Sequence, residues 1–292
     1  MSASACPCCC TPTLAGQACT GCHLRPDASG RLWRQPGPHA APAGFDDAAA
    51  SRLADLDASQ HFWMSHRLAL IRRLLEHRHR ERGKPWRRVL ELGCGAGAAL
   101  PLLESYAHDV TAVDGHGHLL ERARDRSATA RLIEGDVTDT GLPAGQHDLI
   151  CAFDVLEHVD PDRFLGEARR LATDDADLLL SVPAGQYLWS RMDEEAGHRC
   201  RYDPPMLRGE LARNGWSPGR RTHYQMLLLP LLYVSRRWAR AQTHASRERA
   251  PAPWVATLLG EINRAEVGLF HRLNLPMGSS LFMWAQAETP SK

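Results

Sequence analysis

Three glycines follow a short apolar stretch at a spacing that could bring backbone close to a small ligand. Residues 89–92 run directly into Gly93, Gly95 and Gly97. Glycine allows a close approach of backbone to ligand, and the start of a following helix offers N–H groups without helical partners. A dinucleotide fingerprint would place its third glycine three positions after the second, whereas both spacings here are two. The loop therefore favours a nucleoside ligand over a dinucleotide.

Two acids downstream have the chemistry to hold such a nucleoside. Asp114 follows a second apolar stretch, and its carboxylate could accept both hydroxyls of a ribose. Asp136 follows a third stretch, within residues 134–137, and could accept from an adenine amino group. Because the carboxyl ends of consecutive parallel strands meet at one crevice, we expect the glycine loop and both acids to converge there.

A second chemical cluster lies in residues 193–202, which mix acidic, basic, aromatic and imidazole groups. His198 is the best general-base candidate by type, since imidazole titrates near neutrality, and Asp193 could orient it. Tyr202 is a further catalytic candidate. The alternative interpretation is that His198, Arg199 and Arg201 only hold this loop in place.

Six of the nine cysteines lie within the first 22 residues. Cys6 and Cys9 are two residues apart in the chain, as are Cys19 and Cys22, and such pairs supply four thiolates for a structural zinc ribbon. Rival ligands for the fourth position are Cys8, Cys10 and His23. A disordered thiol-rich tail is the alternative. In a reducing compartment the crowding favours metal over disulfides.

The elements that must position these residues alternate between strands and helices from residue 88 onward, which predicts a doubly wound α/β fold with a seven-stranded, mostly parallel sheet. The predicted helices cover 97–106, 117–126, 161–172 and 204–213. The predicted strands cover 88–92, 109–113, 130–134, 148–153, 177–182, 219–228 and 280–287.

Three regions follow from changes in pattern along the chain. Residues 1–45 lack periodicity and predict a cysteine-rich metal module with a loose linker. Residues 46–85 predict one or two amphipathic helices. Residues 86–292 form the main domain, with a helical insertion at 230–276 that holds predicted helices at 231–241 and 254–273. So long an insertion predicts a lid over an acceptor pocket or a dimer contact.

The order of these motifs resembles the class I S-adenosylmethionine-dependent methyltransferases over about residues 60–292. The resemblance rests on residues 91–97, Asp114, the pair Gly135 and Asp136, and residues 154–158 (Asp-Val-Leu-Glu-His). It implies a cofactor-binding set made of Glu91, Gly93, Cys94, Gly95, Gly97, Asp114, Gly115, Asp136, Val137, Asp154 and Val155. Within this set the glycines and Glu91 would surround methionine, Asp114 would hold the ribose, and Asp136 with Val137 would read adenine.

The acceptor side is similar to a large bacterial branch of these enzymes that does not define a substrate. Residues 154–158 also resemble ubiquinone-type O-methyltransferases, where two acids and a histidine are associated with a divalent cation. That resemblance implies Asp154, Glu157 and His158 as ligands of Mg²⁺ or Mn²⁺, although many relatives with this motif lack a metal. We therefore expect His158 near the cofactor, as a catalytic candidate without metal.

Composition limits the partners. Thirty-five lysines and arginines against 34 acids give a formal net charge of +1, which predicts no general attraction to nucleic acid or anionic membranes. The opening residues lack a charged segment followed by an apolar run, so we expect no secretory leader and a cytoplasmic location. No apolar stretch approaches the roughly 20 residues of a membrane-spanning helix.

The function predicted from the sequence is methyl transfer to a small molecule, metabolite or peptide, with a homodimer as one assembly. The alternative is an RNA methyltransferase that contacts its substrate through the zinc module, helped by a local basic surface of Arg220, Arg221, Arg236, Arg237 and Arg240. A non-enzymatic cofactor sensor is a third interpretation, which the intact glycine loop and both acids disfavour.

Overall fold

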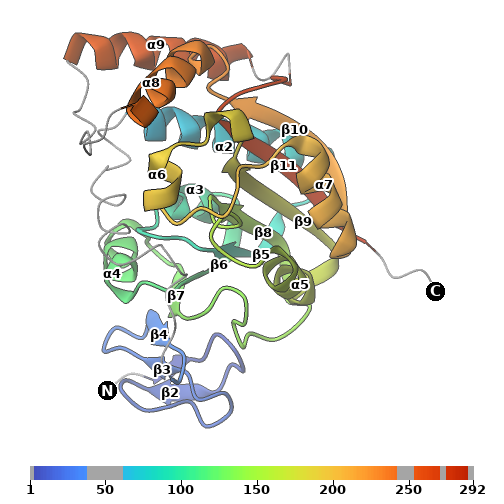
Figure 1. The fold of residues 1–292 in the computed structure, drawn as a ribbon. Coiled ribbons are helices and arrows are strands. Elements are labelled where there is room, and N and C mark those ends of the chain that lie inside the picture. The colour runs from blue at the N-terminus through green and yellow to red at the C-terminus, as the bar shows by residue number, and fades with distance from the viewer. Residues whose placement is uncertain (1–2, 38–61, 242–252, 270–273, 289–292) are drawn as a thin grey trace.

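The computed structural model describes residues 3–37, 62–241, 253–269 and 274–288. Its centre is a sheet of nine strands in the order β10-β11-β9-β8-β5-β6-β7-β4-β3 (Figure 1). Five parallel strands form its middle, and they are β5 (Trp86–Leu92), β6 (Ala107–Asp114), β7 (Arg131–Glu134), β8 (His147–Phe153) and β9 (Ala172–Pro183). Strand β11 (Ser280–Ala287) lies antiparallel between β9 and β10 (Trp216–Tyr224).

Helices cover both faces of this sheet, because its middle strands carry apolar residues on both sides. One face packs against α2 (Phe62–Arg82), α3 (Leu100–Glu104) and α4 (Gly117–Arg126). The other face packs against α5 (Pro161–Leu171) and α7 (Pro204–Arg213). The predicted doubly wound α/β architecture is confirmed.

The N-terminal residues add two strands to the sheet. Strands β1 (Ala3–Ala5) and β2 (Pro12–Leu14) pair with each other, while β3 (Arg25–Pro26) pairs with β4 (Leu32–Arg34). Strand β4 then pairs in parallel with β7, from Leu32 opposite Leu132 to Arg34 opposite Glu134. All seven strands predicted for the main domain are present, and β3 and β4 extend the same sheet to nine strands. These two additional strands were not predicted, because strands of two or three residues are too short to show periodicity.

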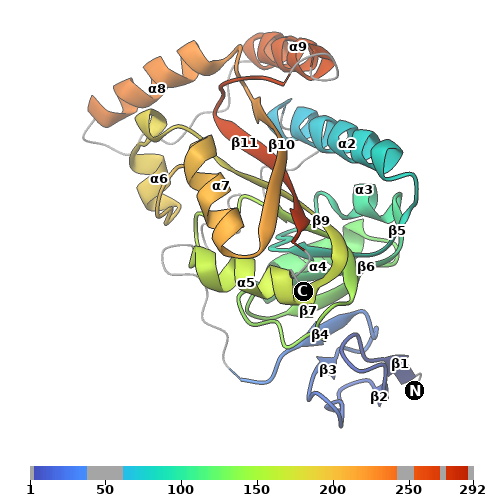
Figure 2. The ribbon, with the colours of Figure 1, turned by 90° about the vertical axis from the view of Figure 1, so that its right-hand side faces the viewer.

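The helical insertion lies at the end of the molecule opposite the N-terminal module (Figures 1 and 2). It contains α8 (Leu229–Ala241) and α9 (Pro253–Leu269), and α9 packs along α2. Loop residues between β9 and α7 form a turn of 3-10 helix, η1 (Gln186–Leu188), and the short helix α6 (Arg191–Glu195).

Several boundaries differ from those predicted. The helix after the glycine loop begins at Leu100, since Gly93, Gly95 and Gly97 all have positive φ and the turn cannot become helical earlier. Strand β9 begins at Ala172, directly after α5, and β10 ends at Tyr224, before the predicted limit of 228. Helices were predicted over residues 46–85, and the first part of this region, residues 46–61, lies outside the described residues.

No helix within the described ranges is both long enough and apolar enough to cross a bilayer.

Candidate functional site

The glycine loop at the end of β5 is a turn that only glycine fits. Gly93 has a φ of +76°, and a Cβ there would lie 2.3 Å from Cγ2 of Val155. Gly97 has a φ of +75°, and its Cβ would lie 2.8 Å from Cβ of Ala123 in α4. The loop is tied to the neighbouring strand because the N–H of Gly93 donates to the Val113 carbonyl at 2.8 Å. Backbone is thereby exposed at the carboxyl edge of the sheet, where ligands bind in folds of this type.

Asp114, the last residue of β6, joins the loops of two strands. Its Oδ2 accepts from the N–H of Gly95 at 2.7 Å, and its Oδ1 accepts from the N–H of His116 at 2.8 Å. Gly115 follows without a side chain, and a Cβ there would lie 3.9 Å from the Gly135 carbonyl after β7. The first two expected contacts with a nucleoside, the glycine loop and Asp114, therefore lie together.

Glu91 lies one residue before the end of β5 and is buried. Its Oε2 has no hydrogen-bond partner among the described residues. Burial, together with the nearby charge of Asp114, raises the pKa of Glu91 to about 8. A buried carboxyl group with an unused acceptor atom is costly unless a ligand supplies the missing donor.

Asp136 follows β7, and its loop is held by the N-terminal module. The Asp136 Oδ1 accepts from Thr138 N and Oγ1, both at 2.7 Å. The Asp136 N–H donates to Oε1 of Gln35 at 3.0 Å, and Nε2 of Gln35 donates to the Asp139 carbonyl at 3.1 Å. Val137, whose side chain is buried, completes this loop. The module thus contacts the segment expected to read adenine.

Asp154 directly follows β8 and has a φ of +58°, which is unusual for a residue with a side chain. Its Oδ2 lies 2.6 Å from Nη2 of Arg67, a buried arginine of α2, and Ser181 Oγ donates to its Oδ1 at 3.2 Å. An ion pair with a buried partner is strong enough to hold this conformation. Asp154 therefore lies just after β8 and beside the glycine loop, because its neighbour Val155 packs against Gly93.

The loop between β9 and α7 is organised around Asp193, which is buried in α6. Oδ1 of Asp193 lies 3.0 Å from Nδ1 of His198 and 2.7 Å from Nη2 of Arg201. Its Oδ2 lies 2.9 Å from Nη1 of Arg236 in α8. Burial alone would raise the pKa of Asp193, but these hydrogen bonds and charges hold it well below its usual range.

Two histidines and a glutamate meet between this loop and β8. One donor atom from each of Glu157, His158 and His198 lies within 4.8 Å of the other two, and the two imidazole rings are 4.9 Å apart. Burial and the neighbouring His198 lower the pKa of His158 to about 4, while burial and Asp154 raise the pKa of Glu157. Oε2 of Glu157 has no hydrogen-bond partner among the described residues.

The divalent-metal set implied by the resemblance was Asp154, Glu157 and His158, and it does not assemble. The Asp154 carboxylate is engaged by Arg67 and Ser181, whereas His198 joins Glu157 and His158. The structure thus brings together a different trio, Glu157, His158 and His198. Asp193 lies outside this trio and contacts Nδ1 of His198 at 3.0 Å.

Two other predicted residues lie in the core. Tyr202 is buried, and its hydroxyl donates to the Leu156 carbonyl at 3.5 Å. Cys94 is buried, and burial with the neighbouring charge of Asp114 raises the pKa of its thiol. Both side chains contribute packing beside the site.

The four predicted N-terminal cysteines form one cluster. Sγ of Cys6 lies 3.2 Å from Sγ of Cys22, and Sγ of Cys9 lies 3.2 Å from Sγ of Cys19. Two matched turns create it, since Cys10 N–H donates to the Cys6 carbonyl at 2.9 Å and His23 N–H donates to the Cys19 carbonyl at 2.8 Å. Cys8 points elsewhere, and its thiol donates to the Gly141 carbonyl at 3.4 Å.

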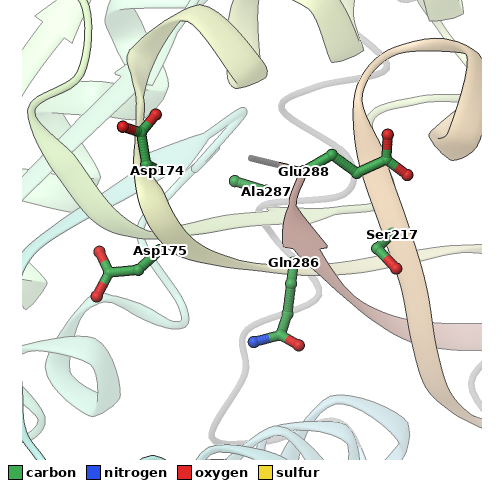
Figure 3. Close-up of a pocket in the computed structure, with 6 residues that line it drawn as sticks. All are labelled: Asp174, Asp175, Ser217, Gln286, Ala287 and Glu288. Atoms are coloured by element: carbon green, nitrogen blue, oxygen red, sulfur yellow. The ribbon is translucent and has the colours of Figure 1, made fainter. Parts of the chain in front are cut away.

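A surface hollow of about 580 Å³ lies at the other edge of the sheet, near the amino end of β9 (Figure 3). It contains none of the residues discussed above, and in α/β sheets the amino ends of strands are not where cofactors bind. Its lining consists of Asp174, Asp175, Ser217, Gln286, Ala287 and Glu288.

Sequence reasoning missed three residues that the structure places at the site. Arg67 lies on the buried stripe of α2, one turn before Ile71, and a basic residue at an apolar position was the available signal. Gln35 carried no signal, since it acts through a contact about 100 residues away. Arg236 was interpreted as part of a basic surface, whereas it pairs with Asp193.

Comparison with known proteins gives consistent matches. Residues 90–180 match the family model described as a methyltransferase domain. A probable S-adenosylmethionine-dependent methyltransferase of Mycobacterium tuberculosis strain H37Rv is 27% identical over 145 residues, which is 49% of this chain and 50% of that protein. A similarly described protein of Mycolicibacterium smegmatis is 28% identical over 127 residues, 43% of this chain and 47% of that protein. The matches thus span about half the length of these curated relatives.

Solved structures share the fold at low sequence identity. A chain from the complex between the Haloferax volcanii Trm112 methyltransferase activator and a methyltransferase superimposes with a TM-score of 0.57. It is 16% identical and covers 86% of this chain and 100% of that chain. A protein assigned as a sarcosine dimethylglycine methyltransferase of Galdieria sulphuraria gives a TM-score of 0.50 at 13% identity, covering 75% of this chain and 85% of that chain.

Proposed function

This chain carries a class I S-adenosylmethionine-dependent methyltransferase domain, and we propose from that premise that it methylates a small-molecule, metabolite or peptide acceptor. The observation that supports this most is the meeting of the glycine loop, Glu91 and Asp114 at the carboxyl ends of adjacent parallel strands. The residues found there match the needs of a nucleoside that carries an amino acid and so combines a ribose, a base and a cationic amine.

Each residue then has a defined part in holding the cofactor. Asp114 accepts from the ribose hydroxyls, and its existing bond to Gly95 keeps the loop in position for them. Glu91 fits the α-ammonium group, because its buried Oε2 lacks a donor. Asp136 and Val137 border the adenine, and Asp154 lies between cofactor and acceptor.

Bound S-adenosylmethionine supplies a methyl group on a sulfonium, whose displacement releases a neutral thioether. The protein's main task is therefore to align the acceptor, and a base is needed only for an acceptor that loses a proton. We assign that role to His198. Asp193 holds its Nδ1 at 3.0 Å, which leaves Nε2 to take the proton. One ring nitrogen of His198 also lies within 4.8 Å of donor atoms of Glu157 and His158.

The main test uses cofactor with a labelled methyl group, incubated with fractions of lysate from the native host. Asp114→Ala should abolish labelling. Asp109→Ala is the matched control, because Asp109 lies on the same strand but pairs with Arg131 at the opposite end. Labelling that survives Asp114→Ala would contradict the proposal, as would the absence of any calorimetric heat with cofactor or demethylated product.

His198→Gln separates the proposed base from a loop anchor. If His198 takes a proton, the labelling rate should fall by about 10²-fold or more while cofactor affinity stays unchanged. If His198 only holds the loop, the variant should lose thermal stability and keep its rate. Asp193 is a poorer target, because its removal leaves buried arginine charge unpaired.

The RNA-methyltransferase alternative has weaker support. Of the five arginines expected to form a basic surface, Arg220 bonds to Asn274, Arg236 to Asp193, and Arg237 lies over the Tyr233 ring. RNA binding driven by phosphate contacts would weaken steeply with salt. Filter retention of RNA at two ionic strengths would show such binding, whereas the proposed small acceptor predicts none.

We also propose that Cys6, Cys9, Cys19 and Cys22 hold a structural zinc ion. The residues fit this ion, since their four sulfur atoms all lie within 4.8 Å of one another and the two turns are matched. Zinc would supply no chemistry to the reaction and would order the module. Metal analysis should give one zinc per chain, lost in a Cys19→Ser, Cys22→Ser variant and kept in Cys8→Ser. Unchanged zinc in the double variant would end this assignment.

A further inference from the structure

Exposed apolar side chains gather at one end of the molecule. We call the loop between β9 and α7, residues 184–203, the acceptor loop. Apart from Leu14 and Met206, every large hydrophobic residue that is exposed within the described ranges belongs to this loop, α8, α9 or the segments beside them. They are Tyr187, Met192, Leu227, Leu231, Tyr233, Val234, Trp254, Leu258, Leu269 and Met277. We call this set the apolar end. Apolar patches of this kind mark contact surfaces in soluble proteins.

Helix α8 contributes three of these exposed residues, Leu231, Tyr233 and Val234. Leu231 and Val234 lie one turn apart and are 53% and 59% exposed. The opposite side of the helix faces the protein, where Leu229 is buried and Arg236 Nη1 bonds to Ser190 Oγ and Asp193 Oδ2, both at 2.9 Å. The helix therefore rests on the acceptor loop and leaves an apolar stripe uncovered.

Charge distinguishes among possible occupants of this surface. Helix α8 contains three arginines and no acid, and because Arg236 pairs with Asp193 on the protein side, Arg237 is an exposed charge at this surface. Arg237 is exposed and lies over the Tyr233 ring at 5.9 Å, so a cation borders the apolar stripe. Two copies meeting through α8 would bring like charges together, which costs binding energy. Anionic headgroups over acyl chains would instead meet both the arginine and the apolar side chains.

The position of the apolar end also allows contact with an extended surface such as a membrane. It lies opposite the N-terminal module, so the module does not obstruct an approach from that side (Figures 1 and 2). Trp254, at the start of α9, is 72% exposed, and tryptophan is enriched at membrane–water interfaces. The Tyr187 ring of the acceptor loop lies 6.4 Å from that of Tyr233, which links the acceptor side to this surface.

We propose that the apolar end docks peripherally on an anionic lipid surface, and that the methyl acceptor is an amphiphile presented there. Docking would bring the acceptor loop, with His198, to the level of the lipid headgroups. The acceptor class rests on the proposed methyltransferase function, whereas docking itself can be measured without turnover.

The test is flotation of the full-length protein with two kinds of vesicle, phosphatidylcholine alone and phosphatidylcholine with phosphatidylglycerol. We expect binding to the anionic vesicles that weakens as salt is raised. Leu231→Asp with Val234→Asp should reduce the bound fraction at least about tenfold. Arg237→Gln should reduce binding to anionic vesicles and flatten its salt dependence. Met206→Asp, at an exposed apolar residue of α7, should bind like the parent chain.

Absence of flotation with either vesicle would overturn the docking proposal, as would binding that the double variant retains. A parent dimer that the double variant converts to monomer, without vesicle binding, would assign the apolar end to self-association. Calorimetry with the demethylated cofactor separates this outcome from failure of the proposed function. The double variant should bind the demethylated cofactor as tightly as the parent chain does. If the parent chain does not bind this cofactor at all, the proposed methyltransferase function is wrong.

Discussion

Among single residues, Asp114 has a structural role in addition to its proposed contact with the cofactor, because its two oxygens accept hydrogen bonds from the N–H groups of Gly95 and His116. Asp114→Asn would keep the shape of the side chain but replace one acceptor oxygen with an NH₂ group. That group would then face the N–H of Gly95 or of His116, which is also a donor. We expect the affinity for S-adenosylmethionine to fall by about tenfold to a hundredfold. Calorimetry would measure this, with Asp109→Asn as the control, and equal affinities would show that the carboxylate is not a cofactor contact.

His147, at the start of β8, should make stability depend on acidity. Burial lowers its pKa from 6.5 to about 4 in the folded chain. Between these two pH values the imidazole is therefore neutral in the folded state and protonated in the unfolded state. The stability that this neutral histidine contributes is complete above about pH 6.5 and is lost as the pH falls towards 4.

His147→Gln should therefore unfold less readily in acid than the parent chain does. Between pH 7 and pH 5, we expect the parent to lose about 2 kcal/mol more than the variant does. Urea titrations at both pH values would measure the difference. His108→Gln, at an exposed residue of β6, is the control and should follow the parent, while matching losses in His147→Gln would contradict the argument.

Among single elements, the turn from β5 to α3 depends on glycine for two separate reasons. Gly97 and Gly83 both have positive φ, but only Gly97 faces a neighbour, with Ala123 at 2.8 Å from the position of a Cβ. Gly97→Ala should destabilise the chain by about 1 to 3 kcal/mol more than Gly83→Ala does. Denaturant unfolding would show it, and equal losses would mean that backbone strain alone matters.

The segment after β4 offers a test of whether the module supports the cofactor site. Gln35 bonds to three backbone groups of the loop that begins at Asp136. Gln35→Ala should weaken cofactor binding by about fivefold to tenfold, since the loop loses these bonds. Gln146→Ala, which removes a glutamine near the amino end of β8, is the control. Unchanged affinity in Gln35→Ala would show that the loop holds itself.

Regular elements were predicted best where their pattern is local. The buried stretches at 88–92 and 148–153 identified β5 and β8, and the helix at 117–126 matches α4. The glycine spacing and Asp114 identified one edge of the sheet, since that inference needed only the parallel order of strands. Short strands such as β4 were missed because three residues carry no period, and pairing with β7 is a contact across the chain.

Side-chain partners were harder to predict than elements. The proximity of His198 to Asp193 follows from a spacing of five residues, which a short turn can bridge. Nothing local joins either residue to Arg236, 43 positions after Asp193. Similarly, the divalent-metal trio implied by the resemblance was wrong, because Arg67 from a distant helix engages Asp154.

For the molecule as a whole, the N-terminal module is part of the sheet. Leu32 and Trp33 of β4 are fully buried and face opposite sides of the sheet, one in each of its two cores. Loss of the proposed zinc should therefore disturb more than the module, because β7 would become an exposed edge that can pair with other chains.

Chelation should lower the melting temperature by roughly several degrees and increase aggregation. Scanning fluorimetry and light scattering would measure both effects before and after a chelator is added. The same chelator saturated with zinc is the control. A melting temperature unaffected by metal removal would show that the module and the sheet are held by packing alone.

The parallel pairing of β4 with β7 also imposes an order of events on a nascent chain. Arg34 pairs with Glu134, so the partner strand leaves the ribosome about 5 to 20 seconds after β4 at ordinary rates of synthesis. Throughout that interval Leu32 and Trp33 lack the strand beside which they pack, because β7 has not yet been synthesised. This delay is a window in which chaperones could bind the young polypeptide, and slower translation would lengthen it.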